Sequence, residues 1–205
     1  AVLPFVNSTR DEELEYIVDG LTDNIINNLS CVSKMRVMSH SAVFRYKACE
    51  VDPQTAGKEL GASAVLLGQI SVQRSGFVVS VELVDVATGW QLWGKTFDSE
   101  SKDLLEIQSV ITRQVLSTLN LELSGAEEKR VTARYTENAE AYQAYLEGRY
   151  HWSRYTKKGI EKAIKHFRHA IEIDPNYALA YAGIVDCYLR LATNYLPPED
   201  DVQWS

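Results

Sequence analysis

The sequence predicts an α/β domain, a mixed sheet with packed helices, followed by an all-α helical-repeat segment. Residues 1–123 contain two kinds of segment in turn. Some have an apolar side chain at every second position, as strands do, and the others have apolar side chains at helical spacing. In residues 139–205 the spacing is helical throughout. Residues 124–138 are polar and carry a charge cluster, so they are the predicted linker.

The α/β domain begins with a short apolar segment and a long helical pattern. Residues 2–6 are expected to form a buried strand, and residues 35–39 a second one. Residues 11–31 between them carry apolar side chains at helical spacing. Ser8 or Thr9 is expected to cap this helix, because a hydroxyl oxygen there accepts a free backbone N–H.

The rest of the domain is predicted as a short helix, three strands and a final helix. The short helix begins after Asp52 and ends before Gly61, a residue suited to the end of a helix. Alternating patterns then predict an antiparallel meander with strands at residues 64–72, 77–84 and 90–97. Residues 101–120 return to helical spacing.

Helical spacing predicts three helices in the second half, at residues 139–155, 157–173 and 178–195. Small residues lie between their aromatic ones, as closely packed antiparallel helices require. Residues 139–195 resemble tetratricopeptide repeats, with one full repeat and the first helix of the next. The residues that carry this resemblance are Leu146, Gly148, Ala163, Phe167, Ala170 and Pro175. The first turn between helices is about three residues longer than in that family.

Residues 1–121 resemble the TolB amino-terminal-like domain. The matching segments are residues 1–5, 19–22, 44–47, 61–68 and 83–93. In bacterial signalling proteins such a domain stands beside these repeats, together with an adenylate cyclase, a winged-helix DNA-binding domain or a serine/threonine kinase. The resemblance therefore implies a regulatory part of a larger protein.

Composition and motifs narrow the functions further. The net charge is −7, so the chain as a whole lacks the strongly basic character of nucleic-acid-binding proteins. No apolar run reaches the roughly 18 residues that a membrane helix needs. No nucleophile elbow, zinc-protease motif or phosphate loop is present. His166 and His169 lie three residues apart, but no ligand cluster stands beside them in the sequence, and a solvated helix face explains them better. We expect no catalytic residue, metal or cofactor.

A basic cluster is the main candidate for a binding site. Residues 149–169 contain seven lysines and arginines against one glutamate. These cations are expected to point outward, as a solvated face or as a dock for an acidic partner segment. Aromatic side chains of the same region are candidate anchors. The predicted partner-binding residues are Arg154, Lys158, Lys162, Lys165, Arg168, Tyr145 and Trp152.

The sequence thus predicts a non-catalytic regulatory or protein-interaction module of a larger bacterial signalling protein, which binds a protein partner or itself. The alternative is a small-molecule sensor that controls an attached cyclase, kinase or DNA-binding effector. A third interpretation is that this chain is an enzyme in its own right. The compartment is left open, as cytoplasm or as the periplasmic part of an anchored protein. Cys31, Cys49 and Cys187 are expected as buried or half-buried free thiols, with a Cys31–Cys49 disulfide as the alternative in an oxidising compartment.

Overall fold

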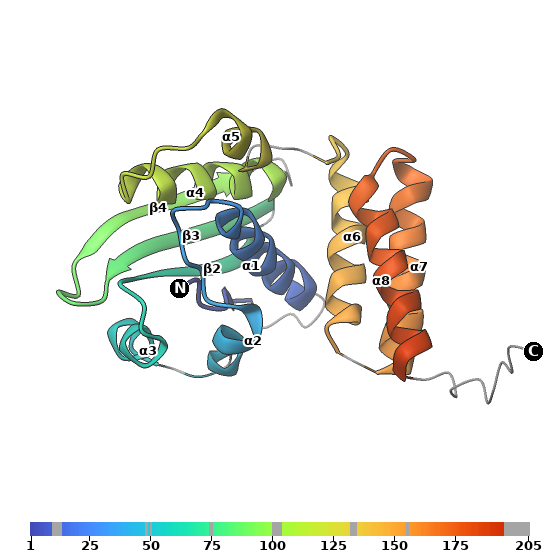
Figure 1. The fold of residues 1–205 in the computed structure, drawn as a ribbon, viewed down its shortest axis with the longest axis horizontal. Coiled ribbons are helices and arrows are strands. Elements are labelled where there is room, and N and C mark those ends of the chain that lie inside the picture. Colours follow the sequence, from blue (N-terminus) through green and yellow to red (C-terminus); the bar gives the residue numbers. More distant parts are fainter. Residues whose placement is uncertain are drawn as a thin grey trace, which may run out of the picture. The chain divides into compact units, whose positions relative to one another are not determined.

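The computed structural model describes residues 1–9, 14–47, 49, 51–73, 76–99, 104–131, 135–154 and 156–194. The chain divides into two compact units, Ala1–Arg134 and Tyr135–Ser205, which we describe separately. Figure 1 shows a sheet with helices in the first unit and the helices α6, α7 and α8 in the second. The predicted α/β architecture is therefore present in the first unit, and the second unit is helical.

The first unit is built on a four-stranded sheet in the order β1-β2-β3-β4. Its strands are β1 (Val6–Asn7), β2 (Ala64–Gln73), β3 (Gly76–Asp85) and β4 (Gln91–Ser99). β1 runs parallel to β2, and the other neighbours are antiparallel. The predicted meander is confirmed. Within the described residues β4 pairs with β3 alone, so it forms one edge of the sheet.

The predicted strand at residues 2–6 is only partly formed. Val2 forms an isolated parallel bridge to Leu66, and regular pairing begins only at Val6. Pro4 has no backbone N–H to donate, and the N–H of Phe5 donates to Thr22 Oγ1 at 3.0 Å. The ladder is interrupted at these two residues.

One face of this sheet forms the core. Leu66 lies opposite Leu83, and Ile70 lies opposite Val79, and all four side chains are buried. Two helices, α1 (Glu15–Ser30) and α4 (Leu104–Thr118), pack against each other and contribute side chains beside Leu66 and Leu83. The opposite face is polar around Ser80 and Thr96, which are hydrogen-bonded at 3.0 Å, while Val65 and Val84 are buried at one end of it. This one-sided burial explains the alternating pattern of β3.

The start of α1 differs from the prediction. The helix begins at Glu15, and Leu14 takes the N-cap position with no side-chain hydrogen bond. Residues 10–13 lie outside the described residues. Capping of α1 by Ser8 or Thr9 is wrong, because Leu14 holds the N-cap position; Thr9 instead donates its N–H and its hydroxyl to Asn7 Oδ1, at 3.1 and 2.7 Å.

Residues 35–39 do not form the second predicted strand. Met35 and Val37 line the end of the core beside Leu29 and Leu66, so their apolar side chains are half-buried without a ladder of backbone hydrogen bonds. A short apolar segment does not distinguish these two outcomes. The chain continues into α2 (His40–Val43) and the short 3-10 helix η2 (Phe44–Tyr46).

The short helix α3 (Pro53–Leu60) and the helix α4 confirm their predictions. Asp52 caps α3 by accepting the N–H of Thr55 at 2.9 Å, and Gly61 ends it with a left-handed φ of 65°. The first residues predicted for α4, 101–103, lie outside the described residues. α3 thus packs against the sheet, and both of its ends are capped.

The segment expected as a linker contains a further helix, α5 (Gly125–Val131). It packs on α1 and α4 and belongs to the first unit. The Glu127 carboxylate accepts the N–H and hydroxyl of both Ser124 and Ser33, at 2.7 to 2.9 Å. These four hydrogen bonds lower the pKa of Glu127 to about 2. They tie α5 to the end of α1.

The second unit consists of α6 (Ala139–Trp152), α7 (Lys157–Ile173) and α8 (Ala178–Asn194), which confirms the three predicted helices. Asn138 caps α6 and Thr156 caps α7. α7 packs against both of its neighbours, with the Phe167 ring at the centre. No helix in the described part of the chain is long and apolar enough to span a membrane.

Candidate functional sites

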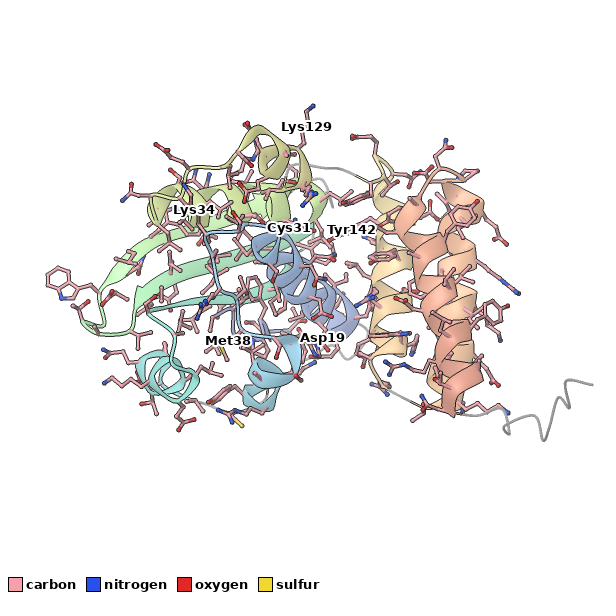
Figure 2. All side chains as sticks on the ribbon, viewed as in Figure 1. Asp19, Cys31, Lys34, Met38, Lys129 and Tyr142 are labelled. Atoms are coloured by element: carbon pink, nitrogen blue, oxygen red, sulfur yellow. The ribbon has the colours of Figure 1, made fainter. Side chains whose placement is uncertain are left out.

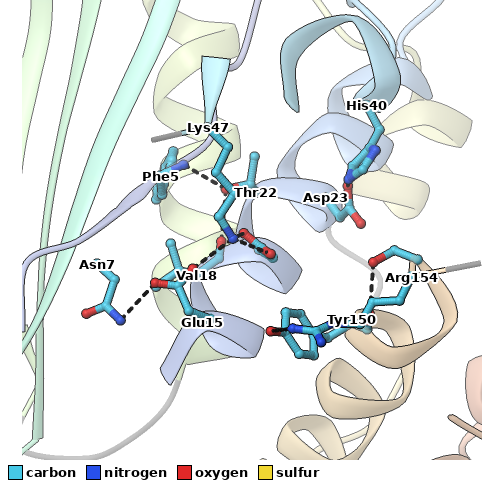
Figure 3. A network of polar contacts seen from close by, with 12 residues as sticks. Phe5, Asn7, Glu15, Val18, Thr22, Asp23, His40, Lys47, Tyr150 and Arg154 are labelled. Atoms are coloured by element: carbon cyan, nitrogen blue, oxygen red, sulfur yellow. Dashed lines mark hydrogen bonds and ion pairs between the residues drawn. The ribbon is translucent and has the colours of Figure 1, made fainter. Parts of the chain in front are cut away.

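The first polar cluster lies at the start of α1 (Figure 3). Lys47 Nζ is 2.7 Å from Glu15 Oε2 and 2.6 Å from Asp19 Oδ2. Asn7 Nδ2 donates to the other Glu15 oxygen at 3.1 Å. Burial opposes the charged form of Glu15, but the hydrogen bonds from Lys47 and Asn7 bring its pKa below the ordinary value. Burial likewise opposes the charge of Lys47, yet its bonds to Asp19 and Glu15 raise its pKa.

A second pair extends this polar row along α1. Asp23 Oδ1 lies 3.3 Å from His40 Nε2, and the His40 ring stacks on Phe44 with centroids 3.7 Å apart. Glu15, Asp19 and Asp23 are each four residues apart, so they share one side of α1. The two aspartates hold neighbouring segments in place, and this geometry gives them a structural role.

The segment 44–47, which carries part of the TolB resemblance, fastens three elements of the first unit. Phe44 contacts α2 through His40, and Lys47 reaches α1. The Tyr46 hydroxyl donates to Glu59 of α3 at 2.6 Å. The segment therefore organises the domain.

In the second unit, Lys158, Lys162 and Lys165 are exposed on α7, and we call them the basic face. Their spacing of four and three residues places them on adjacent turns of one side of the helix. The buried side of α7 consists of Gly159, Ile160, Ala163, Ile164, Phe167 and Ala170. Within the described residues, no carboxylate lies within ion-pairing distance of the three lysines. The basic face is available to an acidic partner.

Two predicted arginines are exposed but hold neighbouring tyrosines. The Arg154 guanidinium lies over the ring of Tyr150, 4.6 Å from its centroid, and donates to its hydroxyl. Arg168 donates to the hydroxyl of Tyr188 of α8 at 3.1 Å. Both arginines keep their charge at the surface, beside the turn before α7 and on the side of α7 toward α8.

The two predicted aromatic anchors pack within the second unit. Tyr145 is 7% exposed and contacts the rings of Phe167 and Tyr177, with centroids 5.7 and 5.2 Å apart. Trp152 is half-buried, and the guanidinium groups of Arg149 and Arg190 lie 4.7 and 4.4 Å from its ring. The exposed part of the predicted site is therefore cationic, without either aromatic residue in an exposed position.

A histidine pair lies where α6 and α7 meet, and the sequence analysis did not find it. The rings of His151 and His166 stack with centroids 5.1 Å apart, and His166 Nδ1 is 2.5 Å from Glu147 Oε2. Burial lowers the pKa of His151, and the charges of His166, Lys162 and Arg154 lower it further. The two histidines are fifteen residues apart on different helices, so no spacing within one helix reveals them.

The sequence singled out His166 and His169 as a pair, but the two side chains have different partners. His166 lies next to Glu147, and His169 lies next to Glu172. Among the described residues, no group of three or more His, Cys, Asp and Glu is arranged to hold a metal ion. All three cysteines are free thiols, as expected, and Cys187 is buried, but Cys31 and Cys49 are exposed, so the prediction that they are buried or half-buried is wrong. Burial raises the pKa of Cys187 to about 11.

The fold defines a small α/β domain that carries a three-helix unit. Residues 1–114 match the family described as "HilA/YgeH-like transcriptional regulator, second domain", and the chain belongs to this family. The helices of the second unit lie beyond that match, so their assignment as tetratricopeptide repeats stays a prediction.

The chain is also similar to a protein of Rhizobium meliloti (strain 1021) named "Putative adenylate cyclase 3". The two are 31% identical over 184 residues, which cover 90% of this chain and 31% of that protein. The chain thus spans about a third of the length of this relative.

Two solved structures show a more distant similarity. TolB from Acinetobacter baumannii has a TM-score of 0.44 and 16% identity, over 58% of this chain and 27% of that one. A lipoprotein from Neisseria meningitidis has a TM-score of 0.39 and 21% identity, over 58% of this chain and 96% of that one.

Proposed function

We propose that the chain is a non-catalytic regulatory module of a larger bacterial signalling protein. Its membership in a family of transcriptional-regulator domains supports this role. The relative named for adenylate cyclase supports it further, because the chain spans only 31% of that protein and so leaves most of its length for an effector. The attached effector is then an adenylate cyclase, a winged-helix DNA-binding domain or a serine/threonine kinase.

The module acts by binding a protein partner, and the basic face of α7 is the contact. The observation that carries this proposal is a set of three exposed lysines without an acidic partner among the described residues. Arg154, just before α7, and Arg168, on the side of α7 toward α8, add positive charge next to the basic face. A partner segment rich in aspartate and glutamate fits this surface, because complementary charge speeds association and selects the partner.

The test is the binding of a fluorescent poly-glutamate peptide to the whole chain. Reversing Lys158, Lys162 and Lys165 to Glu is expected to weaken binding about tenfold or more, since each exposed pair is worth roughly 0.5 kcal/mol. Raising the salt concentration is expected to weaken the unmodified chain's binding as well, because exposed charges are screened.

A matched control reverses three exposed lysines of the first unit, Lys34, Lys58 and Lys129, two of which are labelled in Figure 2. This variant has the same net charge as the α7 variant. Equal weakening by both variants would show that only net charge matters and would remove the basic face as a site. Unchanged binding in the α7 variant would also contradict the proposal.

The sensor alternative has less support. A cavity beside Leu66 and Leu83 has a volume of about 20 Å³, which holds one water molecule rather than a metabolite. The basic face therefore remains the stronger basis for a function.

A further inference from the structure

Strand β4 forms a long free edge of the sheet in the first unit (Figure 1). Its pairing with β3 is regular from Trp93 to Ser99. This stretch contains no proline, and the register shift in the β3–β4 pairing lies before it. Proteins normally protect such an edge with bulges, prolines or charges. Here the protection comes from two charged residues, Lys95 and Asp98.

Hydrogen bonds at the end of β3 show which of its residues bond to β4. Successive residues of an antiparallel strand direct their N–H and C=O groups to opposite sides. Val86 donates to the carbonyl of Ser63 on the β2 side at 2.9 Å. Asp85 donates to the carbonyl of Trp90 on the β4 side at 2.9 Å. The β2–β3 register is unbroken, so the alternation holds along β3 and its odd-numbered residues bond to β4.

The same alternation determines which backbone groups of β4 face outward. The β4 residues opposite the odd-numbered residues of β3 bond inward, and they are Trp93, Lys95 and Phe97. The residues that follow each of them direct both backbone groups to the free edge, and we call them the edge residues. The edge residues are Gly94, Thr96 and Asp98. A fifth strand can therefore pair with three N–H groups and three carbonyls.

The inward-bonding residues carry the side chains that a fifth strand would meet on the core side of the sheet. They lie opposite three buried residues of β3, Leu83, Val81 and Val79. Trp93 and Phe97 are half-buried, and Lys95 is exposed. Lys95 Nζ lies 4.9 Å from the Phe97 ring centroid, and no carboxylate of the described residues forms an ion pair with it. The edge thus presents a cation without an ion-pair partner between two aromatic side chains.

We propose that β4 binds an extended segment of a partner protein as a fifth, antiparallel strand. An acidic residue of the segment lies opposite Lys95, and apolar residues lie opposite Trp93 and Phe97. Pairs at these three positions are of the non-hydrogen-bonded kind, in which opposite side chains are closest, so a carboxylate there reaches the ammonium. Backbone hydrogen bonds to the edge residues provide affinity, and the alternate side chains provide specificity.

A second copy of β4 fits this edge poorly. Its core-side residues include the same lysine, so it brings an ammonium where the edge favours a carboxylate. The proposal also goes beyond the function proposed above, because it concerns the first unit and a strand edge instead of the basic face of α7. Either contact can therefore fail without the other.

The first test is amide hydrogen exchange of the whole chain, measured by NMR with and without millimolar synthetic peptide Thr-Val-Thr-Glu-Thr-Val-Thr. Without peptide we expect slow exchange at Trp93, Lys95 and Phe97 and fast exchange at the edge residues. The peptide is expected to slow exchange of the edge residues about tenfold or more, because their N–H groups become hydrogen-bonded. Unchanged exchange at the edge residues would overturn the proposal.

The second test asks whether the edge selects an acidic residue. A control peptide with lysine in place of glutamate is expected to bind about fivefold more weakly, since like charges oppose each other across strands. Lys95→Glu is expected to reverse this preference. If both chains bound the two peptides equally, the acidic partner would be excluded.

The third test blocks the edge itself. Thr96→Pro removes the central outward N–H, and an edge strand tolerates proline where the N–H faces away from the sheet. This variant is expected to lose peptide binding. Thr96→Ala is the matched control, because it also loses the hydroxyl that bonds to Ser80 but keeps the N–H, so it should bind normally.

Undiminished binding by a folded Thr96→Pro chain would show that the peptide binds elsewhere. If that variant does not fold, the charge reversal at Lys95 still decides the proposal. The triple reversal of Lys158, Lys162 and Lys165 is expected to leave peptide protection of the edge residues unchanged. Failure of the basic face and failure of the β4 edge are therefore separate results.

Discussion

The ring of Phe167 lies directly against Gly148, so close that a Cβ on Gly148 would come within 2.5 Å of it. On the other side, a Cβ on Gly183 would come within 2.7 Å of the same ring. One aromatic side chain of α7 thus sets its distance from both neighbouring helices. Small residues at helix contacts are what the sequence predicted for this segment, and Phe167 shows which side chain requires them.

Gly148→Ala is therefore expected to destabilise the second unit. Overpacking of this kind costs about 1–3 kcal/mol, while the better helix propensity of alanine returns up to about 1 kcal/mol. The measurement is urea unfolding followed by circular dichroism. Adding Phe167→Leu should recover part of the loss, because it removes the clash. Gly125→Ala is the control, since no heavy atom lies within 4 Å of its Cβ position. Equal effects of the two alanines would contradict the packing argument.

The Lys47 cluster predicts an acid-dependent stability of the first unit. The pKa of Glu15 is lowered in the folded state, so its contribution to stability is present above its unfolded pKa and is lost as the pH falls through the folded one. Lys47→Met removes the Lys47 ammonium from between Glu15 and Asp19, which is expected to lower stability by about 1–3 kcal/mol at neutral pH.

The same substitution changes the pH profile. Without Lys47 the two carboxylates repel, so acid relieves the variant instead of weakening it. Denaturant unfolding between pH 3 and 7 should give a stability loss from Lys47→Met that shrinks toward low pH. A constant loss at all pH values would show that Lys47 acts only through the packing of its aliphatic chain.

The position of His151 predicts how the stability of the second unit changes in mild acid. Its pKa is lowered by burial and by the charges of His166, Lys162 and Arg154, with Glu147 acting in the opposite direction. The unfolded chain therefore takes up this proton first, and stability falls as the pH drops below the unfolded pKa of about 6.5. Hydrogen exchange of α6 and α7 amides at pH 7.5 and 5.5 measures this change.

His151→Gln is expected to reduce the acid sensitivity of α6 and α7, because glutamine does not titrate. The control is His169→Gln, on an exposed histidine whose partner is Glu172 at 3.5 Å. If both variants keep the full pH dependence of the unmodified chain, His151 is not the responsible group.

Regular elements were predictable because their side chains repeat in a fixed pattern. Val79, Val81 and Leu83 alternate with polar residues, and the alternation locates β3. The same argument failed for Met35 and Val37, whose side chains are half-buried without a neighbouring strand. Tyr145 shows the corresponding limit for sites: an aromatic residue predicts a contact, but whether it lies inside or outside depends on the neighbouring helix. The stacking of His151 on His166 depends on the way two helices pack, which no local pattern records.

The edge strand β4 supplies the last prediction. Its outer backbone groups have no strand partner within the described residues, and an open edge of this kind invites pairing with another chain.

Lys95 lies in the middle of β4, with its ammonium 4.9 Å from the Phe97 ring centroid. A lysine at the centre of an edge strand opposes strand pairing, because a second copy would have to bury or repel the charge. Lys95→Val should therefore increase association, measured by light scattering. Thr96→Val adds similar apolar surface to the same strand and keeps the lysine, so it should associate less. If the two variants associated equally, apolar surface alone would be the cause, and Lys95 would have no protective role.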